Sequence, residues 1–214
     1  MNVFDAQAFL FDMDGVLVDN CRYHVQSWLA CAEKYGGSLT EEQIVAWMGA
    51  PGRDYVRRMF NRPDLPESEI AFYLDEKEAL YRELYAPHLA LPKGLRAVLD
   101  EARRRGIVCA IATGGSLANV DFVLDGLGLR GDFVAVVDAS RYSRGKPFPD
   151  CYLKAAEEVG VSPARCLVFE DAVNGIEAAH AAGIPVVAKV GTNTRRVLEA
   201  AAADRVIEAF DELL

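Results

Sequence analysis

Five short apolar runs, separated by longer amphipathic segments, constrain the fold of this chain more than any other feature of its sequence. The runs are rich in Val, Ile and Phe, and they occupy residues 8–11, 107–112, 133–137, 166–169 and 185–190. Apolar side chains also recur at helical spacing in residues 94–105, 117–127, 150–159, 173–182 and 194–202. Continuous apolar strands that alternate with amphipathic helices are typical of a parallel sheet covered on both faces. The sequence therefore predicts an α/β fold with a doubly wound parallel sheet.

The alternation stops between residues 19 and 90, where the pattern is helical throughout. Helices are expected over residues 23–35, 40–48, 54–60 and 68–85. Thr40 with Gln43 forms the pattern of a capping box, and Gly36 with Gly37 ends the preceding helix. We predict a core domain of residues 1–18 and 91–214, with a small all-helical domain of residues 19–90 inserted after the first strand. Ligands of open α/β sheets bind outside the carboxyl ends of the strands, so the insertion leaves the core where it could cover a site.

The composition is that of a folded protein, because 51% of the 214 residues are apolar and 26% are charged. The 32 acidic and 23 basic residues give a net charge of −9. An acidic surface repels phosphate backbones and anionic lipids, so nucleic acids and membrane surfaces are not expected partners. No apolar run approaches the ~20 residues of a membrane span.

The five cysteines are widely spread and contain no Cys-x-x-Cys pair. This pattern argues against a disulfide framework, a structural zinc site and a dithiol redox site. Cys109 and Cys166 lie inside apolar runs and are expected to be buried, inert thiols. A reducing cytoplasm fits best. No segment marks a subunit interface, and we expect a monomer.

Polar residues follow the apolar runs at the points where strands should end. Asp12 and Asp14 follow the first run, and Gly15 lets the chain turn tightly beside them. On local sequence alone, a turn or a helix cap explains this pair equally well. Later runs end in Thr113-Gly114-Gly115-Ser116 and in Glu170-Asp171, and Lys146 lies between them in the segment Gly145-Lys146-Pro147-Phe148-Pro149-Asp150. Such strand ends meet at one edge of a parallel sheet, which predicts a shared site.

These four elements resemble the haloacid dehalogenase superfamily of phosphotransferases, in that family's order and at its strand ends. The string Phe169-Glu170-Asp171-Ala172-Val173-Asn174-Gly175-Ile176-Glu177-Ala178-Ala179 is especially specific. Together with the helical insertion, the resemblance covers nearly the whole chain. It implies a HAD-like, Rossmannoid core with a small helical cap. Dehalogenation is not expected, because the dehalogenases of the superfamily lack the second aspartate that Asp14 represents.

The resemblance also implies roles for the residues at the strand ends. Asp12 is the expected nucleophile that forms an aspartyl-phosphate, and Asp14 is the expected general acid and then base. Thr113 and Gly114 would bind the transferring group, and Lys146 would offset its charge. Two plainer interpretations stay open: Thr113 could cap the helix that follows it, and Lys146 could be a solvated loop cation.

The same resemblance implies Mg²⁺ as the cofactor, a hard cation that takes oxygen ligands. Its expected ligands are Asp12, the backbone carbonyl of Asp14, and Asp171. Glu170 lies alongside, and whether it touches the metal or supports a ligand is left open.

Within the superfamily, the chain is most similar to the β-phosphoglucomutase-like subfamily. His24, Trp28 and Lys77 match cap residues that approach the substrate in the mutases, and Arg53 and Ser116 complete the expected substrate-binding set. A histidine or tryptophan on a helix also commonly belongs to a core, and a lysine to a solvated surface.

Departures from the mutase pattern weaken a mutase assignment, among them the lack of the mutases' polar run in Thr113-Gly114-Gly115-Ser116-Leu117. In an alignment on Gly49 and Asp54, Gly52 fills the place of an arginine that grips the second phosphate in the mutases, and Arg53 comes one residue late. Asn20 also stands where the mutases usually have threonine. The expected function is therefore a Mg²⁺-dependent phosphatase for small phosphorylated metabolites, with sugar phosphates as the expected class. The alternatives are a hexose-phosphate mutase and a non-catalytic phosphate-binding regulator.

Overall fold

The computed structural model describes residues 2–47 and 50–214, so the expected helix end at Met48 and the alignment position Gly49 lie outside the described residues. The chain forms two compact units. An α/β unit comprises Met1–Asp19 and Leu89–Leu214, and a helical unit comprises Asn20–His88. These boundaries lie one or two residues from those expected from the sequence.

The α/β unit is built on a parallel sheet of six strands in the order β3-β2-β1-β4-β5-β6. The strands are β1 (Ala8–Phe11), β2 (Val108–Ala112), β3 (Ala135–Val137), β4 (Cys166–Glu170), β5 (Val186–Lys189) and β6 (Arg205–Ile207). Phe11 of β1 lies opposite Ile111 of β2 and Phe169 of β4. This register brings the carboxyl ends of the three central strands level with one another.

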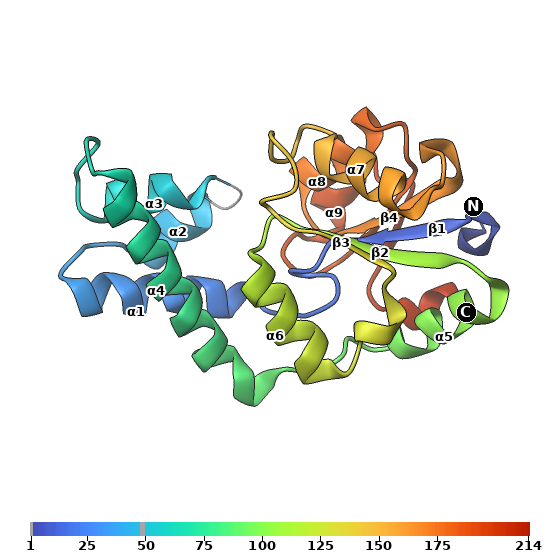
Figure 1. Ribbon diagram of the computed structural model, residues 1–214, viewed down its shortest axis with the longest axis horizontal. Coiled ribbons are helices and arrows are strands. Elements are labelled where there is room, and N and C mark those ends of the chain that lie inside the picture. The colour runs from blue at the N-terminus through green and yellow to red at the C-terminus, as the bar shows by residue number, and fades with distance from the viewer. Residues whose placement is uncertain (1, 48–49) are drawn as a thin grey trace. The chain divides into compact units, whose positions relative to one another are not determined.

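Helices cover both faces of this sheet. Figure 1 shows α7 (Asp150–Val159), α8 (Val173–Ala181) and α9 (Arg195–Ala200) on one face, with α5 (Leu95–Arg105) and α6 (Leu117–Leu127) on the other. Short 3₁₀ turns lie at Val3–Asp5, Arg130–Asp132, Pro163–Arg165 and Phe210–Leu213. The fold is therefore the doubly wound α/β fold that the sequence predicts.

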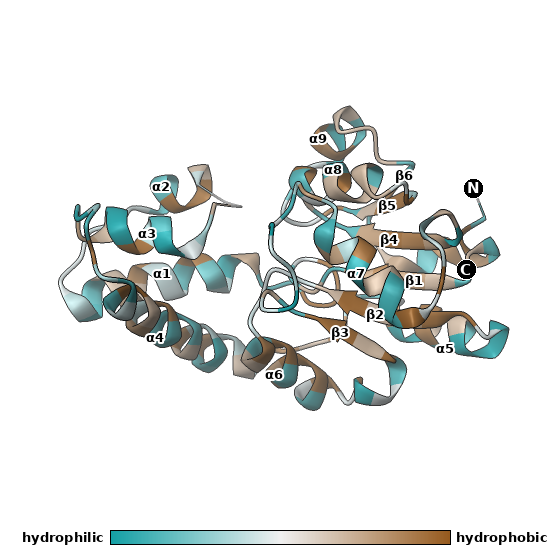
Figure 2. Ribbon diagram, turned by 45° about the horizontal axis from the view of Figure 1, so that its top comes forward, coloured by the Kyte–Doolittle hydropathy of each residue, from teal (hydrophilic) through white to brown (hydrophobic). Residues whose placement is uncertain are grey.

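Apolar packing on both faces of the sheet explains why its strands read as continuous hydrophobic runs. Every residue of β1, β4 and β5 is buried, and the strands are predominantly brown in Figure 2. Phe11 stacks on Phe169 with ring centroids 4.6 Å apart, and Phe210 packs against both rings. Such aromatic contacts pack one face of β1 and β4, the strands that carry the acidic site.

The helical unit contains α1 (Cys21–Tyr35), α2 (Glu41–Ala46), α3 (Gly52–Met59), α4 (Glu67–Tyr85) and a 3₁₀ turn at Ala86–His88. Thr40 and Gln43 form the expected capping box at the start of α2. Both tryptophans of the chain are in this unit. Trp28 stacks on Tyr55 at 4.8 Å, and Trp47 meets the same ring edge-on at 5.8 Å. The unit thus has an apolar core of its own.

The differences from the expected elements are confined to their ends and to one strand. α3 begins at Gly52, two residues earlier than expected, and α9 is shorter than residues 194–202. Strand β6 was not predicted, because its three residues include the charged Arg205 and make no apolar run. Four of the five cysteines are buried, Cys109 and Cys166 among them, and all five are free thiols.

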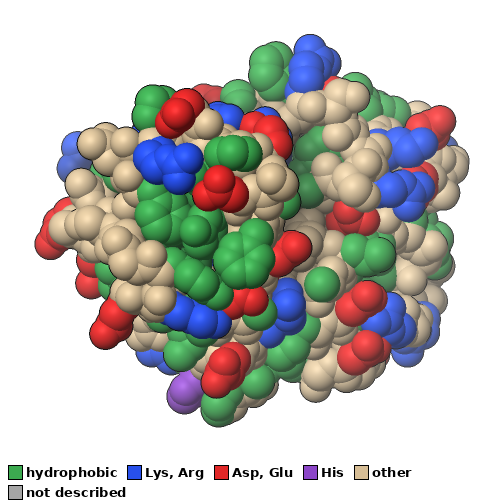
Figure 3. Space-filling model, turned by 60° about the vertical axis from the view of Figure 1, so that its left-hand side comes forward, with side chains coloured by type: hydrophobic (Ala, Val, Ile, Leu, Met, Phe, Trp, Pro, Cys, Tyr) green, Lys and Arg blue, Asp and Glu red, His purple; other side chains and the backbone are tan. Residues whose placement is uncertain are grey.

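The distribution of surface charge and the length of the helices are relevant to nucleic acids and membranes as partners. Acidic and basic side chains are interspersed on the face shown in Figure 3, which also carries a patch of hydrophobic side chains. Among the helices of residues 2–47 and 50–214, none combines the length and the apolar character that a bilayer crossing needs.

Candidate active site

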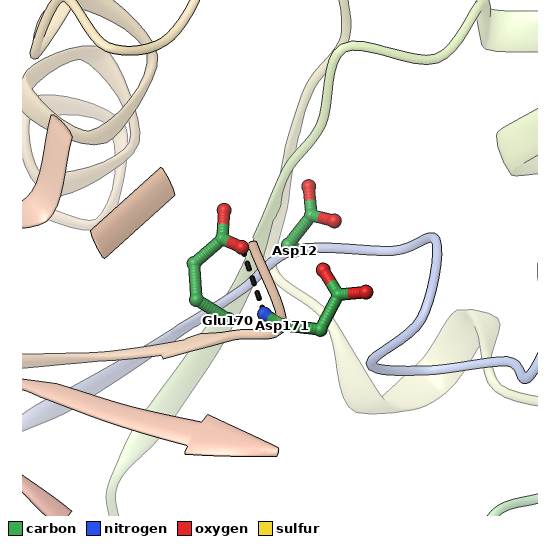
Figure 4. A group of neighbouring side chains, drawn as sticks. All are labelled: Asp12, Glu170 and Asp171. Carbon is green, nitrogen blue, oxygen red and sulfur yellow. Dashed lines mark hydrogen bonds between the residues drawn. The ribbon is translucent and has the colours of Figure 1, made fainter. Parts of the chain in front are cut away.

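Three buried carboxyl groups meet at the carboxyl ends of β1 and β4. Asp12 follows β1, Glu170 ends β4 and Asp171 comes next, and one oxygen of each lies within 4.8 Å of the others. All three side chains are almost inaccessible, with at most 7% of any residue exposed. Figure 4 shows the group, with Glu170 turned toward the backbone N–H of Asp171. The strand-end pattern in the sequence brings these residues together because the strands are parallel and in register.

Lys146 is the cation of this cluster. Its Nζ donates to Asp12 Oδ1 at 2.7 Å and to Glu170 Oε1 at 2.6 Å, and only 11% of its side chain is exposed. The Lys146–Pro147 peptide bond is cis. The interpretation of Lys146 as a solvated loop cation is therefore wrong, because the side chain is buried and paired with two carboxylates. Without such partners, burial of an ammonium group would be prohibitively costly.

Glu170 has both carboxyl oxygens engaged by protein donors. Oε1 accepts from Lys146 and from the Tyr152 hydroxyl at 2.7 Å, and Oε2 accepts from the backbone N–H groups of Asp171 at 2.8 Å and Ala172 at 3.1 Å. Gly175 packs so tightly against this carboxyl group that a Cβ there would lie 1.8 Å from Oε1. The arrangement favours a positioning role for Glu170 over direct metal ligation.

Asp171 is held from the loop that follows β5. The side chain of Asn193 donates to the backbone carbonyl of Asp171 at 3.0 Å, and the Thr192 hydroxyl bonds to its carboxyl group. A Cβ on Gly15 would lie 1.9 Å from Asp171 Oδ2, and Gly15 adopts a φ of +77°. Only glycine therefore fits at position 15, for reasons of both space and backbone conformation.

The electrostatics of the cluster favour a bound cation. Burial, reinforced by the neighbouring carboxylates and opposed by Lys146, raises the pKa of Asp12 to about 7. Burial and the charges of Glu170 and Asp12 raise the pKa of Asp171 well above its usual value. Burial also opposes the charge of Glu170, but Lys146 and the hydrogen bonds to Glu170 lower its pKa overall.

These carboxyl groups fit a magnesium ion. They offer hard oxygen donors within 4.8 Å of one another, and Lys146 alone leaves the charges of Asp12 and Asp171 incompletely balanced. A divalent cation removes that imbalance, and a small number of carboxylates together with substrate oxygens is the set that Mg²⁺ prefers.

Asp14 and Thr113 both lie close to Gly115. A Cβ at Gly115 would be 3.3 Å from Thr113 Oγ1 and 3.7 Å from Asp14 Oδ2. Thr113 Oγ1 accepts from the Gly115 N–H at 2.9 Å, and its carbonyl accepts from the Tyr142 hydroxyl at 3.1 Å. The charge of Asp14 also helps to raise the pKa of Asp12.

Ser116, and not Thr113, caps helix α6. Ser116 Oγ accepts from the backbone N–H of Asn119 at 3.4 Å. The alternative that Thr113 is merely a helix cap is therefore wrong. Ser116, which was expected to contact substrate, has a structural role as the cap of this helix.

The residues expected to contact substrate from the insertion have partners within the helical unit. Lys77 is 3% exposed, and its Nζ lies 2.8 Å from His24 Nδ1 and 2.8 Å from Glu78 Oε1. The alternative that Lys77 is a solvated charge is wrong. Trp28 is packed in the core of the unit, as the plainer interpretation holds, and Arg53 is exposed and lies 3.9 Å from a carboxylate oxygen of Glu67.

Comparison with known proteins identifies the family of the chain. The model of the haloacid dehalogenase-like hydrolases matches residues 6–183. Fructose-1-phosphate phosphatase YqaB of Escherichia coli is 34% identical over 180 residues, which are 83% of this chain and 93% of that protein. A mutant of CbbY from Rhodobacter sphaeroides, solved in complex with xylulose-(1,5)bisphosphate, is 29% identical and has a TM-score of 0.86. The match covers 97% of this chain and 96% of that chain.

The β-phosphoglucomutase of Clostridium difficile shares the fold with a TM-score of 0.84, at 24% identity over 98% of this chain and 93% of that chain. The core is Rossmann-like, and the family match together with relatives named as phosphatases supports a hydrolase of phosphoric monoesters. The chain belongs to the haloacid dehalogenase-like hydrolases.

Three supporting residues escaped the sequence analysis. Tyr152 lies on α7 and shows only as one residue of an amphipathic pattern, so nothing in its spacing reveals its bond to Glu170. Thr192 and Asn193 follow β5, and the strand-end rule that found Asp12 and Asp171 could have found them too. That rule predicts a polar contribution from every central strand of a parallel sheet.

Proposed function

We propose that the protein is a Mg²⁺-dependent phosphatase that hydrolyses small sugar phosphates through a phosphoryl group carried on Asp12. The observation that supports this most is the position of Asp12, bound by Lys146 at 2.7 Å within a cluster of buried carboxylates at the strand ends. Lys146 orients the carboxylate of Asp12, and its charge reduces the repulsion that a phosphate dianion would meet there.

Asp12 is the nucleophile of the proposed reaction. One of its carboxylate oxygens attacks the phosphorus atom, and the bond from phosphorus to the sugar oxygen breaks. Asp14 donates a proton to that leaving oxygen and later accepts one from the water that hydrolyses the aspartyl-phosphate. Thr113 Oγ1 and the Gly114 N–H bind the oxygens of the transferring group.

Mg²⁺, when bound, neutralises developing charge on the phosphoryl oxygens. Asp12, the backbone carbonyl of Asp14 and Asp171 are the proposed ligands. Glu170 supports them by holding Lys146 and the backbone of Asp171 in place. Thr192 orients the carboxyl group of Asp171 in the same way.

The substrate class rests on relatives. One is named a fructose-1-phosphate phosphatase, and a second, 32% identical over 97% of this chain, is named hexitol phosphatase A. His24 and Lys77, already bonded to one another, are the proposed polar contributors from the helical unit. Trp28 lies in a hydrophobic core and Arg53 is exposed beside Glu67, so neither side chain is assigned a substrate contact.

The decisive experiment incubates the purified protein with Mg²⁺ and a panel of sugar phosphates that includes fructose 1-phosphate and β-glucose 1-phosphate. Free phosphate and isomerised sugar phosphate are measured in the same reactions. Release of phosphate without isomerisation is expected. If conversion of β-glucose 1-phosphate to glucose 6-phosphate outruns hydrolysis, and Arg53→Ala abolishes only that conversion, the enzyme is a mutase. Binding of phosphate esters with neither reaction would indicate a regulator.

A further inference from the structure

Lys189 is a buried cation on β5 that the proposed chemistry does not use. It is 5% exposed, and its Nζ donates to Asp19 Oδ1 at 2.6 Å, to the Gly15 carbonyl at 3.2 Å and to the Val190 carbonyl at 3.4 Å. An ammonium group has three protons to donate, so these three acceptors satisfy it. Two of the three belong to the loop that follows Asp14.

That loop, residues 14–19, is closed on itself at its base. The Met13 carbonyl accepts from the N–H groups of Val16, Leu17 and Val18, and Asp14 forms a parallel bridge with Val18. The side chains of residues 16–18 are fully buried. The loop is therefore a compact turn, and its orientation on the sheet depends on what holds its two ends.

Lys189 holds both ends from β5, which is separated from β1 by β4 in the sheet. Gly15 is the residue directly after Asp14, and Asp19 is the last residue of the α/β unit before the chain enters the helical unit. We propose that Lys189 is a positioning residue that clasps residues 14–19 and thereby fixes the carboxyl group of Asp14 for proton transfer. The proposal rests on the role of Asp14 in the proposed phosphatase reaction.

The Lys189 contacts matter for the placement of the Asp14 carboxyl group more than for the stability of the fold. A general acid works only within hydrogen-bond reach of the leaving oxygen, and a displacement of about 1 Å can cost a factor of about 100 in rate. Met13 and Gly15 flank Asp14, and both are tied by hydrogen bonds. Loss of the Lys189 contacts removes a restraint on the Gly15 side of Asp14 while leaving the Met13 side intact.

The test compares two esters that differ in their need for an acid. Fructose 1-phosphate has a poor alkoxide leaving group, whereas the phenolate of p-nitrophenyl phosphate departs without protonation. kcat/KM is the right measure, because it reports the first phosphoryl transfer and not the later hydrolysis of the aspartyl-phosphate. Lys189→Met is expected to lower kcat/KM for fructose 1-phosphate by at least about tenfold more than for p-nitrophenyl phosphate.

Two further variants separate positioning from folding. Asp19→Asn removes the same ion pair through a side chain that is 64% exposed, so the fold tolerates it, and it should show the same preference between the two esters. Lys93→Met breaks the 2.7 Å pair with Asp211, which lies in the same unit but does not touch the loop. This matched control should leave the ratio of the kcat/KM values for the two esters unchanged. Equal losses for both esters in Asp19→Asn overturn the proposal.

Amide hydrogen exchange provides a readout that does not depend on catalysis. In Lys189→Met or Asp19→Asn, exchange at Val16, Leu17 and Val18 should be faster than in the wild type, because their bonds to Met13 lose an external restraint. Unchanged exchange at these amides overturns the clasp whatever the activity. If wild-type protein hydrolyses neither ester but exchange quickens, the clasp stands and the proposed phosphatase function fails.

Discussion

At the scale of single residues, the site depends on one lysine shared by two carboxylates. Lys146 contacts both Asp12 and Glu170, and Glu170 receives three further hydrogen bonds that Asp12 lacks. The negative charge on Glu170 accepts more hydrogen bonds and is therefore the more stable of the two. This agrees with the lowered pKa of Glu170 and the raised pKa of Asp12. Two similar side chains thus acquire different roles from their surroundings.

The nucleophile provides the first prediction. Asp12→Asn removes the attacking oxygen and one ligand of the metal, so turnover should fall by about three orders of magnitude or more. The measurement is the initial rate of phosphate release with Mg²⁺, alongside circular dichroism to verify folding. Asp64→Asn, at an exposed position in the helical unit, is the control and should keep full activity. Activity of Asp12→Asn within tenfold of wild type would contradict the assignment.

At the scale of elements, helix α8 reaches the site through a glycine. Alanine normally stabilises a helix interior by about 1 kcal/mol relative to glycine. At Gly175 the added Cβ would collide with the Glu170 carboxyl group, which has no room to retreat because it is buried and bonded on both oxygens.

Gly175→Ala should therefore lower both the melting temperature and the rate of phosphate release. Gly126→Ala is the matched control, since its Cβ meets only the flexible end of the Leu89 side chain. Thermal unfolding and kcat measured on both variants provide the comparison. A Gly175→Ala protein that is more stable than wild type and equally active would show that the contact is not as close as described.

Helix α5 is tied to the turn at Arg130–Asp132 by a forked ion pair. Arg96 donates to both oxygens of Asp132 at 2.7 and 2.6 Å, and these bonds lower the pKa of that carboxyl group. A lowered pKa means that the stabilisation is complete above the ordinary pKa near 3.8 and is lost as the pH falls through the lower, folded-state value.

Asp132→Asn should therefore destabilise the protein at pH 7 by about 1 kcal/mol, a modest amount because Arg96 is 39% exposed. The difference from wild type should shrink as the pH falls below about 4. Urea unfolding at several pH values measures it. A difference that stays constant down to pH 2 would mean that the charge of Asp132 is not its source.

The elements that could be predicted from the sequence are those whose residues repeat a pattern. The apolar runs of β1, β2 and β4 identified the sheet and the edge where Asp12 and Asp171 meet. Strand β6 was missed because a short edge strand next to polar residues has no such run. The contact of Lys189 with Asp19 was out of reach for a different reason: it joins residues 170 positions apart, and local patterns contain no record of such pairs.

At the scale of the whole molecule, charge balance couples the cofactor to stability. Across residues 2–47 and 50–214, Asp12, Glu170 and Asp171 form the one group of three or more potential metal ligands (Asp, Glu, His or Cys) that lie close together. Because its carboxylates repel one another, a cation that binds the folded protein should stabilise it, by about 2.7 kcal/mol at a hundredfold excess over the dissociation constant.

Mg²⁺ should therefore raise the melting temperature and be required for activity, while Ca²⁺ should inhibit. Ca²⁺ accepts longer bonds and looser coordination, which would let Asp12 bind it through both oxygens and lose its alignment for attack. Differential scanning calorimetry and phosphate release, each measured after chelation and after readdition of each ion, provide the data. Full activity after exhaustive EDTA treatment would exclude the proposed ligands.

The placement of the two tryptophans makes the molecule optically asymmetric. Trp28 and Trp47 both belong to the helical unit and share the ring of Tyr55, and the Lys77 ammonium lies 5.3 Å from the Trp28 ring. Indole emission excited selectively therefore originates from that unit alone, and the α/β unit with its acidic cluster is silent at those wavelengths. A phosphate ester or metal added to the unlabelled wild-type enzyme can be followed by intrinsic fluorescence, and any change in the signal reports on α1 and the segment after α2.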